Sequence, residues 1–202
     1  MKTLTAAAAA LALSLAPAAA RAEAIAYAID TGHSQTSFSV KHLVISTVRG
    51  EFGKTEGTVV IDDADVSKSK VEATIDVASV NTREEKRDAH LKSPDFFDVA
   101  RFPTLTFKST KVEKGAEGHL KVTGDLTLKG VTRPVVLDVT GPTKEIKDPW
   151  GNLKRGVAVT GTINRKDFGI AWGTVIEAGP VVGDEVKIEI DAELTKAVAA
   201  RK

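Results

Sequence analysis

Apolar and polar residues alternate with a period of two along most of the chain after residue 28. The clearest runs are 38–42, 71–77, 120–129, 135–139, 157–163 and 186–194. Successive side chains of a β-strand point to opposite faces, so each run predicts a strand with one apolar and one polar face. Such faces are typical of antiparallel sheet. About eight strands at this short spacing predict an all-β barrel or sandwich.

Turn-forming residues separate the runs, as at Lys129-Gly130 and in the stretch 148–152. The segment around residues 82–100 breaks the period and predicts a short helical insert. Thr82 and Glu85 have the spacing of a capping box, which predicts a helix from there to about Lys92. Ser93-Pro94-Asp95 predicts the start of a second short helix. Phe96 and Phe97 are expected to pack this insert onto the sheet.

The first 22 residues have the pattern of a cleavable secretory signal peptide. Lys2 precedes the apolar stretch Leu4–Ala16, and small residues follow it up to Ala22. This stretch is shorter than the roughly 20 apolar residues that a membrane-spanning helix needs. We therefore expect no membrane span, a periplasmic location, one barrel domain over residues 23–196 and a frayed tail over 197–202.

Composition narrows the classes of function. The chain has 28 Lys and Arg residues against 27 Asp and Glu residues, which gives no general attraction to nucleic acid. It has no Cys, which excludes disulfides, thiolate nucleophiles and zinc sites with Cys ligands. The four His residues lack metal-site spacing, and no serine lies in a nucleophile-elbow motif. We therefore predict no metal, no cofactor and no catalytic residues.

The residues expected to face the inside of the sheet are mostly aliphatic. A barrel of about eight strands is just wide enough to be filled by side chains or to hold one small ligand. Aliphatic side chains of modest size, with bulk removed at Gly53, Gly57, Gly124 and Gly161, can leave a dry tunnel that suits an alkyl or isoprenoid chain. The pattern alone nevertheless favours a fully packed sandwich with no cavity. The tunnel candidates are Phe38, Val40, Phe52, Val71, Ile75, Leu105, Phe107, Leu126, Leu128, Leu137, Val159 and Ile188.

Several polar and aromatic residues are candidates for the ends of such a tunnel. His42 shares the apolar face of its run, so it is a polar anchor at the tunnel mouth, one ligand of a His metal site, or a hydrogen-bonded structural histidine. The charge run that holds Arg83 and Arg87 is best explained as a solvated helix face, and the alternative is that one of them meets an anionic headgroup near the barrel opening. Trp150 and Trp172 lie beside turn-like glycines and are predicted to be packing anchors at the barrel rim.

Short blocks along the chain also resemble a known family, in order and over about residues 27 to 195. They include Ile29-Asp30, His33-Ser34, 38–42, 48–52, 87–91, 95–98, 107–109, 124–135 and 164–169. Together they resemble the YceI-like family of periplasmic polyisoprenoid-binding proteins. The resemblance implies a lipocalin-like, eight-stranded antiparallel barrel and a homodimer. It implies that the ligands are long amphiphiles such as polyprenyl phosphates or quinones.

The same resemblance implies roles for polar residues that match its blocks. Some would hold a headgroup at the tunnel mouth, and others would fasten the insert to the barrel. The headgroup candidates are His33, His42, Arg49, Arg87, His90 and Arg165.

The leading hypothesis is a periplasmic carrier of isoprenoid lipids that is not an enzyme. One alternative is an acid–base enzyme acting on an exported lipid through His33, His42 or His90 with Asp30 or Asp88. The other is a structural or partner-binding module, which predicts a filled interior and an exposed apolar patch.

Overall fold

The computed structural model describes residues 24–197. The predicted signal peptide and most of the predicted tail lie outside the described residues. Ala197, the last described residue, donates its backbone N–H to the oxygen of Ala26 at 2.9 Å. Among the described residues, no helix has the length and apolar character needed to cross a membrane.

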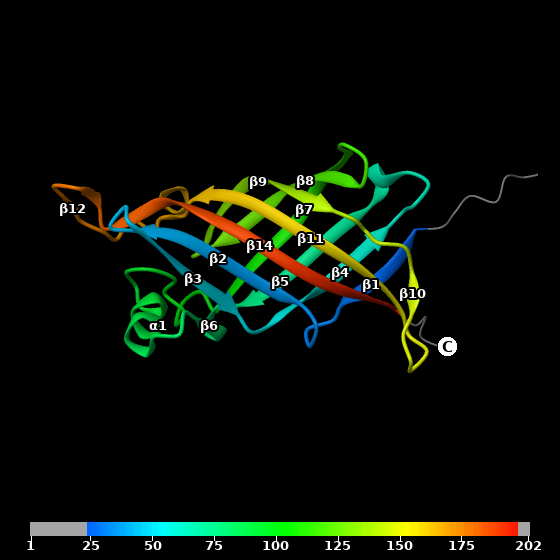
Figure 1. Ribbon diagram of the computed structural model, residues 1–202, viewed down its shortest axis with the longest axis horizontal. Helices are drawn as coiled ribbons and strands as arrows, with labels where there is room; N and C mark the ends of the chain where they lie inside the picture. Colours follow the sequence, from blue (N-terminus) through cyan, green and yellow to red (C-terminus); the bar gives the residue numbers. More distant parts are fainter. Residues whose placement is uncertain (1–23, 198–202) are drawn as a thin grey trace, which may run out of the picture.

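Eight antiparallel strands form a closed ring (Figure 1). The order around the ring is β11-β9-β8-β7-β5-β4-β1-β14, and pairing of β14 with β11 closes it. The all-β, lipocalin-like barrel is therefore confirmed. The ring strands are β1 (Ile25–Ile29), β4 (Thr55–Ile61), β5 (Lys70–Asp76), β7 (Thr104–Lys114), β8 (His119–Leu128), β9 (Val131–Thr140), β11 (Leu153–Asn164) and β14 (Val182–Lys196).

The long strand β14 pairs with different strands along its length. Residues 194–196 pair with β1, whereas residues 182–191 pair with β2 (Gln35–His42). Strand β2 continues to β3 (Ser46–Phe52), which pairs with the short β6 (Val80–Asn81). Toward one end, the wall is therefore built by β2 and β3 instead of β1. The remaining strands are β10 (Ile146–Lys147), β12 (Val175–Ile176) and β13 (Gly179–Pro180), and β10 and β12 lie at opposite ends of the barrel (Figure 1).

The segment just before the helical insert bridges β3 and β7. The short 3-10 helix Val77–Ser79 contacts both strands, and Val77 N donates to Pro103 O at 3.0 Å. Helix α1 (Glu85–Lys92) follows β6 and lies at the end of the barrel that also holds β12 (Figure 1). Two further 3-10 helices are Val66–Lys68 and Arg165–Phe168.

The predicted boundaries of the insert were partly wrong. The N-cap of α1 is Glu84, whose carboxylate accepts from the backbone N–H groups of Lys86 and Arg87. Thr82 cannot cap the helix, because its hydroxyl bonds the side chains of Asp88 and Arg87 instead. The second helix is also absent from the described residues: the chain forms turns after residue 92.

The predicted tight turn between β8 and β9 is confirmed. Leu128 pairs with Val131, which leaves Lys129 and Gly130 as the two turn residues, with φ angles of 50° and 73°. Two consecutive positive φ angles match the twist of the flanking strands, and glycine adopts them without steric cost. This turn fixes the register that directs Val122, Leu126 and their alternate neighbours into the barrel.

Candidate functional site

The barrel encloses a cavity of about 280 Å³. Its walls are the inward faces of the strands together with Leu91, Phe96 and Phe97 of the insert. All twelve predicted tunnel residues lie on this cavity, and so does the predicted packing pair Phe96 and Phe97. The fully packed interior that the pattern alone favoured is therefore wrong. The polar residues on the wall are Ser34, Thr36, Ser37, Thr55, Asp63, Ser69 and Arg165.

Four of the five hydroxyl side chains on the wall are hydrogen-bonded within the protein. Thr36 Oγ1 and Thr55 Oγ1 are 2.9 Å apart and buried. Ser69 Oγ accepts from Asp62 N, and Ser34 Oγ accepts from Glu193 N. A buried hydroxyl with a partner adds little polarity to a cavity, so the interior suits a hydrocarbon chain.

Arg165 lies on the cavity wall at the β12 end and is 5% exposed. Its Nε donates to Gly183 O, and Nη1 donates to Ile170 O and Trp172 O. Its Nη2 donates to Val182 O and to Asp184 Oδ1. Arginine has five N–H donors, so all of them are used within the protein. Of the six predicted headgroup residues, Arg165 is the one that lines the cavity, but its hydrogen bonds make it a structural residue.

The opposite end of the cavity carries a charged group that the sequence analysis missed. Asp63, on the cavity wall, accepts from Arg155 Nη1 at 2.8 Å and from Nη2 at 2.9 Å. The Arg155 guanidinium lies 5.8 Å from the centre of the Tyr27 ring, and Tyr27 donates to Glu145 Oε2 at 2.7 Å. Burial, together with this hydrogen bond, raises the pKa of Tyr27 to about 12. Arg155 lies two positions before Val157 and therefore on the same, inward face of β11. This alternation is the sequence signal that could have identified it.

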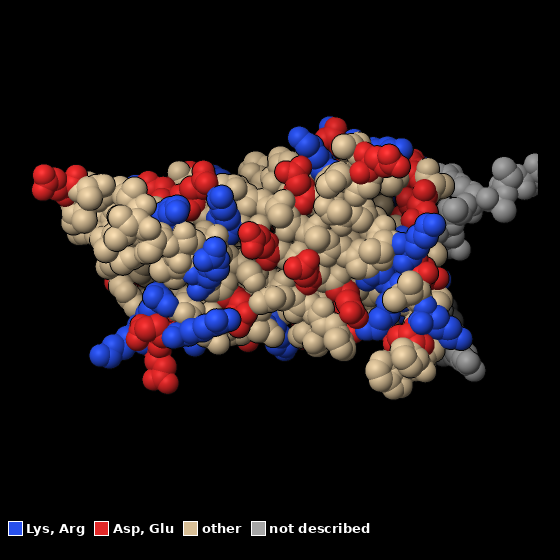
Figure 2. All heavy atoms as spheres, viewed as in Figure 1, with Lys and Arg blue, Asp and Glu red and all other residues tan. Residues whose placement is uncertain are grey.

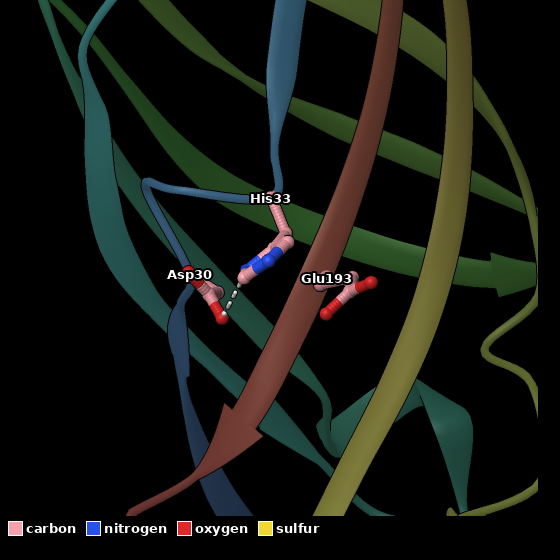
Figure 3. Close-up of side chains that lie close together, drawn as sticks. All are labelled: Asp30, His33 and Glu193. Atoms are coloured by element: carbon pink, nitrogen blue, oxygen red, sulfur yellow. Dashed lines mark hydrogen bonds and ion pairs between the residues drawn. The ribbon is translucent and has the colours of Figure 1, made fainter. Parts of the chain in front are cut away.

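His33 belongs to a polar group that does not line the cavity. In Figure 3, Asp30 and Glu193 lie close to the imidazole, and His33 Nδ1 is 3.1 Å from Asp30 Oδ2. Lys154 Nζ donates to Asp30 Oδ2 at 2.6 Å and to Glu193 Oε2 at 2.9 Å. These bonds lower the pKa of Asp30 to about 2 and raise that of Lys154 to about 12.

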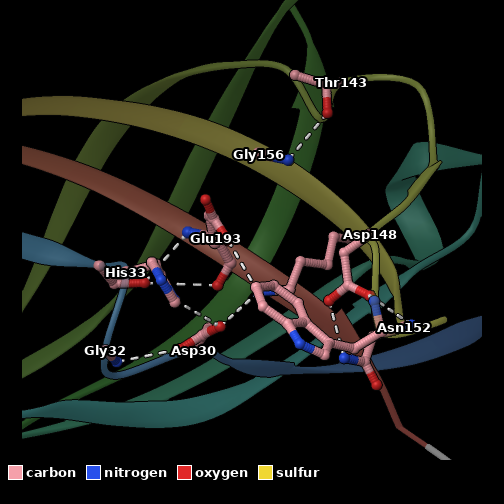
Figure 4. Close-up of polar contacts among 11 residues, drawn as sticks. Asp30, Gly32, His33, Thr143, Asp148, Asn152, Gly156 and Glu193 are labelled. Atoms are coloured by element: carbon pink, nitrogen blue, oxygen red, sulfur yellow. Dashed lines mark hydrogen bonds and ion pairs between the residues drawn. The ribbon is translucent and has the colours of Figure 1, made fainter.

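Asp30, His33 and Glu193 each offer one metal-ligating atom, and these three atoms lie within 4.8 Å of one another. The ammonium group of Lys154 already bonds both carboxylates and balances one of their two negative charges, which weakens their attraction for a cation. Figure 4 shows this network beside the hydrogen bonds of the 148–152 turn. The group therefore joins the β1–β2 connection to β11 and β14.

The other headgroup candidates do not line the cavity. His42 is two residues beyond the cavity-lining Val40, and Arg49 lies on β3 beside a smaller surface depression. Arg87 bonds Thr82 through Nε and Nη2, and so fastens α1 to the chain before it. His90 bonds Asp95 at 2.9 Å. The acid–base alternative requires its groups in one pocket. His33 and Asp30 do pair at 3.1 Å, but neither residue lines the cavity, and His90 bonds Asp95 instead.

The two tryptophans differ in their surroundings. Trp172 packs against the rings of His90 and Phe96, with centroid distances of 4.9 and 5.2 Å. Trp150 is 83% exposed, so its predicted role as a packing anchor is wrong. It lies at the tip of the β10–β11 turn, where Asp148 bonds the surrounding backbone and leaves the indole outside.

Comparison with solved structures supports the same architecture. BcnA of Burkholderia cenocepacia has a TM-score of 0.71 at 25% identity, covering 82% of this chain and 98% of that protein. The YCEI protein of Campylobacter jejuni has a TM-score of 0.67 at 34% identity, covering 78% and 90%. A polyisoprenoid binding domain from Saccharophagus degradans has a TM-score of 0.60 at 18% identity, covering 86% and 99%.

Sequence comparison covers nearly the whole barrel. A UPF0312 protein of Staphylococcus aureus is 41% identical over 172 residues, which is 84% of this chain and 96% of the relative. The family model described as a YceI-like domain matches residues 27–194, from β1 to the end of β14. On this evidence, the chain belongs to the YceI-like family.

Proposed function

We propose that the protein is a periplasmic carrier that binds one isoprenoid lipid tail inside its barrel. The observation that carries this proposal is the apolar cavity enclosed by a closed ring of strands. Burying hydrocarbon contributes about 0.8 kcal/mol per CH₂ group, and ordering the flexible tail offsets part of this gain. Binding and release need no covalent step.

Two further observations support the ligand class and the location. The neighbour from Saccharophagus degradans is described as a polyisoprenoid binding domain and shares this fold. The amino-terminal pattern of Lys2, an apolar stretch and small residues favours export to the periplasm. A homodimer stays a prediction, which sedimentation velocity would test.

The charges on the cavity wall favour an uncharged headgroup, such as a quinone, over a polyprenyl phosphate. Among the described residues, the charged side chains on the wall are Asp63 and Arg165. Arg165 has no N–H left for a ligand, and Asp63 is paired with Arg155. A phosphate drawn into the cavity would lose its hydration without gaining a free cation, which is costly.

Organic extraction of the protein purified from periplasm, followed by mass spectrometry, tests the proposal. We expect a prenyl lipid at close to one molecule per barrel. Delipidated protein should take up a prenyl quinone more tightly than the prenyl phosphate of equal tail length. Recovery of no lipid, combined with no uptake of either compound, would contradict the carrier function. Tighter binding of the phosphate would contradict only the headgroup assignment.

A further inference from the structure

Two loops at the β12 end of the barrel expose large apolar side chains. The turn between β2 and β3 carries Val44 and Ile45, and Ile45 is 83% exposed. The connection between β11 and β14 carries Trp172, Val175 and Ile176, and Val175 is 81% exposed. We call these five residues the apolar end patch. A group of exposed apolar side chains of this kind marks an interaction site more often than scattered single residues do.

The two loops are held together by the backbone. Leu43 N donates to Val181 O at 2.9 Å, and Val181 N donates to Thr174 O at 2.9 Å. A Cβ atom built on Gly179 would lie 3.0 Å from Val44 Cγ2, so the β12–β13 hairpin lies directly against the turn. Leu43 and Val44 have φ angles of 52° and 66°, and the β-branched Val44 in particular rarely adopts such a left-handed conformation. The turn that exposes Val44 therefore carries a steric cost.

The apolar end patch is nearly free of charge. Residues 42–47 contain no Lys, Arg, Asp or Glu, and residues 169–183 contain only Glu177. In Figure 2 the upper left corner, where Figure 1 places β12, is mostly tan with acidic atoms at its extreme tip, while charged side chains gather at the lower left of the same end, where α1 lies. A partner that recognised this surface by ion pairs would find few groups to bind. An apolar surface is a better match for its composition.

The patch is also continuous with the cavity wall. The Trp172 ring packs on Phe96, with centroids 5.2 Å apart, and Phe96 lines the cavity. Arg165, another cavity residue, fixes the Trp172 backbone through the bond from Nη1. Val182, which follows the hydrogen-bonded Val181, lines the cavity too. The exposed apolar surface and the interior are thus two sides of the same wall.

We propose that the apolar end patch docks on the surface of a lipid bilayer, where the barrel loads or delivers its lipid. This inference rests on the proposed function, because a lipid carrier must exchange a water-insoluble ligand with a membrane. Partial insertion of exposed aliphatic and Trp side chains at the interface provides the binding energy. Because the patch contains no Lys or Arg, binding depends little on anionic lipids or on salt.

The opposite end of the barrel provides matched control positions. Ile146 and Trp150 lie at the β10 end and are 63% and 83% exposed. They are separated from the β12 end by the length of the barrel (Figure 1). Substituting them removes a similar amount of exposed apolar surface without touching the patch.

The experiment compares the full-length mature protein with two double variants, Ile45→Ser with Val175→Ser and Ile146→Ser with Trp150→Ser. Circular dichroism and melting temperature establish that each variant is folded. Flotation with phosphatidylcholine vesicles measures docking at low and high salt. Transfer of a fluorescent prenyl lipid from these vesicles measures exchange, and uptake of the same lipid from dilute ethanol solution measures the cavity alone.

We expect the patch variant to float about tenfold less, since two exposed aliphatic side chains are lost from the interface. Its transfer from vesicles should slow in proportion, while uptake from ethanol stays at the wild-type level. The control variant should match wild type, and high salt should leave flotation unchanged. No flotation of wild type, or an equal loss in the control variant, would overturn the proposal.

Sedimentation velocity tests the remaining alternative, which is that a second copy of the chain binds the apolar end patch. A dimer that the patch variant abolishes, with vesicle flotation unaffected, would overturn membrane docking and assign the patch to a second copy. Flotation that depends on the patch, with no lipid uptake from any source, would instead contradict the carrier function and leave docking supported.

Discussion

Arg165 donates from Nη1 to the backbone oxygen of Trp172, with an N···O distance of 2.6 Å. Three more of its bonds go to backbone carbonyls, at Ile170, Val182 and Gly183. One buried side chain therefore joins the connection after β11 to the first residues of β14. The same bonds position the loop that carries Trp172 over the end of the cavity.

Replacing Arg165 with Met should destabilise the protein by about 3–5 kcal/mol, because four carbonyl groups and Asp184 lose a buried partner. Denaturant-induced unfolding followed by circular dichroism measures this change. Lys166→Met is the matched control on the same 3-10 helix. Lys166 is 51% exposed and also pairs with Asp184, so its loss should cost less than about 1 kcal/mol. Equal stability of the two variants would show that the Arg165 network contributes little.

Ala73 is a small residue on the cavity wall, and Ala73→Phe should weaken the binding of a prenyl chain. A phenyl ring would displace the volume of a few methylene groups, which corresponds to about 2–3 kcal/mol of lost binding energy. Calorimetric titration of delipidated protein measures the affinity. Thr74→Phe places the same ring on the outward face of β5 and should leave affinity unchanged. An unaltered affinity in Ala73→Phe would place the ligand elsewhere.

The barrel and its lining could be predicted from sequence because strand periodicity is local. Each inward position follows from its neighbour two residues away, so runs such as 120–129 and 157–163 identify their inward faces without knowledge of their partners. The identity of the ring partners and the long β14 that serves both β1 and β2 depend on distant pairings. Those pairings have no signature within a single run.

The polar ends of the cavity could not be assigned for the same reason. Arg155 and Asp63 are 92 positions apart, and only the closed barrel brings them together. Arg165 matched a block of the family, but the block does not tell whether its N–H groups face a ligand or the backbone. The start of helix α1 could not be predicted either, although it depends on local residues. Thr82 and Glu84 are both plausible N-caps, and the bonds of the Thr82 hydroxyl with Asp88 and Arg87 decide between them.

The Asp30–Lys154 pair gives a pH dependence with a defined sign. The pKa of Asp30 is lowered from 3.8 to about 2, so its stabilising contribution is present above pH 3.8 and is lost as pH falls toward 2. The pKa of Lys154 is raised from 10.5 to about 12, so its contribution is present below pH 10.5 and is lost as pH rises toward 12. The pair therefore stabilises the fold throughout the neutral range.

Lys154→Met should accordingly lower the melting temperature most near neutral pH, and the difference from wild type should shrink at both extremes. Scanning calorimetry of the two proteins from pH 2 to pH 12 measures it. Other groups with shifted pKa values, such as Tyr27 and Asp65, are retained in both proteins, so the difference isolates the pair. A difference that is constant across this range would mean that Lys154 contributes through packing of its stem and not through charge.

Gly124 on β8 lies where its neighbours leave no room for a side chain. A Cβ atom there would meet the Phe107 ring and, at 2.6 Å, the backbone oxygen of Lys108. Gly124→Ala should therefore destabilise the protein by about 1–3 kcal/mol, because backbone cannot move aside cheaply. Gly161→Ala is the matched comparison on β11. Its one close neighbour is Leu137 Cδ2 at 2.6 Å, the end of a side chain that can rotate.

The lower chain entropy of Ala relative to Gly in the unfolded state also offsets part of any strain at Gly161, so that variant should stay within about 1 kcal/mol of wild type. Urea unfolding of both variants measures the contrast. Two equally stable variants would mean that β7 and β8 separate easily at the bulge between Ser109 and Lys111, where their register shifts. If β7 and β8 separated there, a ligand could also enter the cavity through the side of the barrel. The comparison of Gly124→Ala with Gly161→Ala therefore tests whether the barrel wall is rigid at this point.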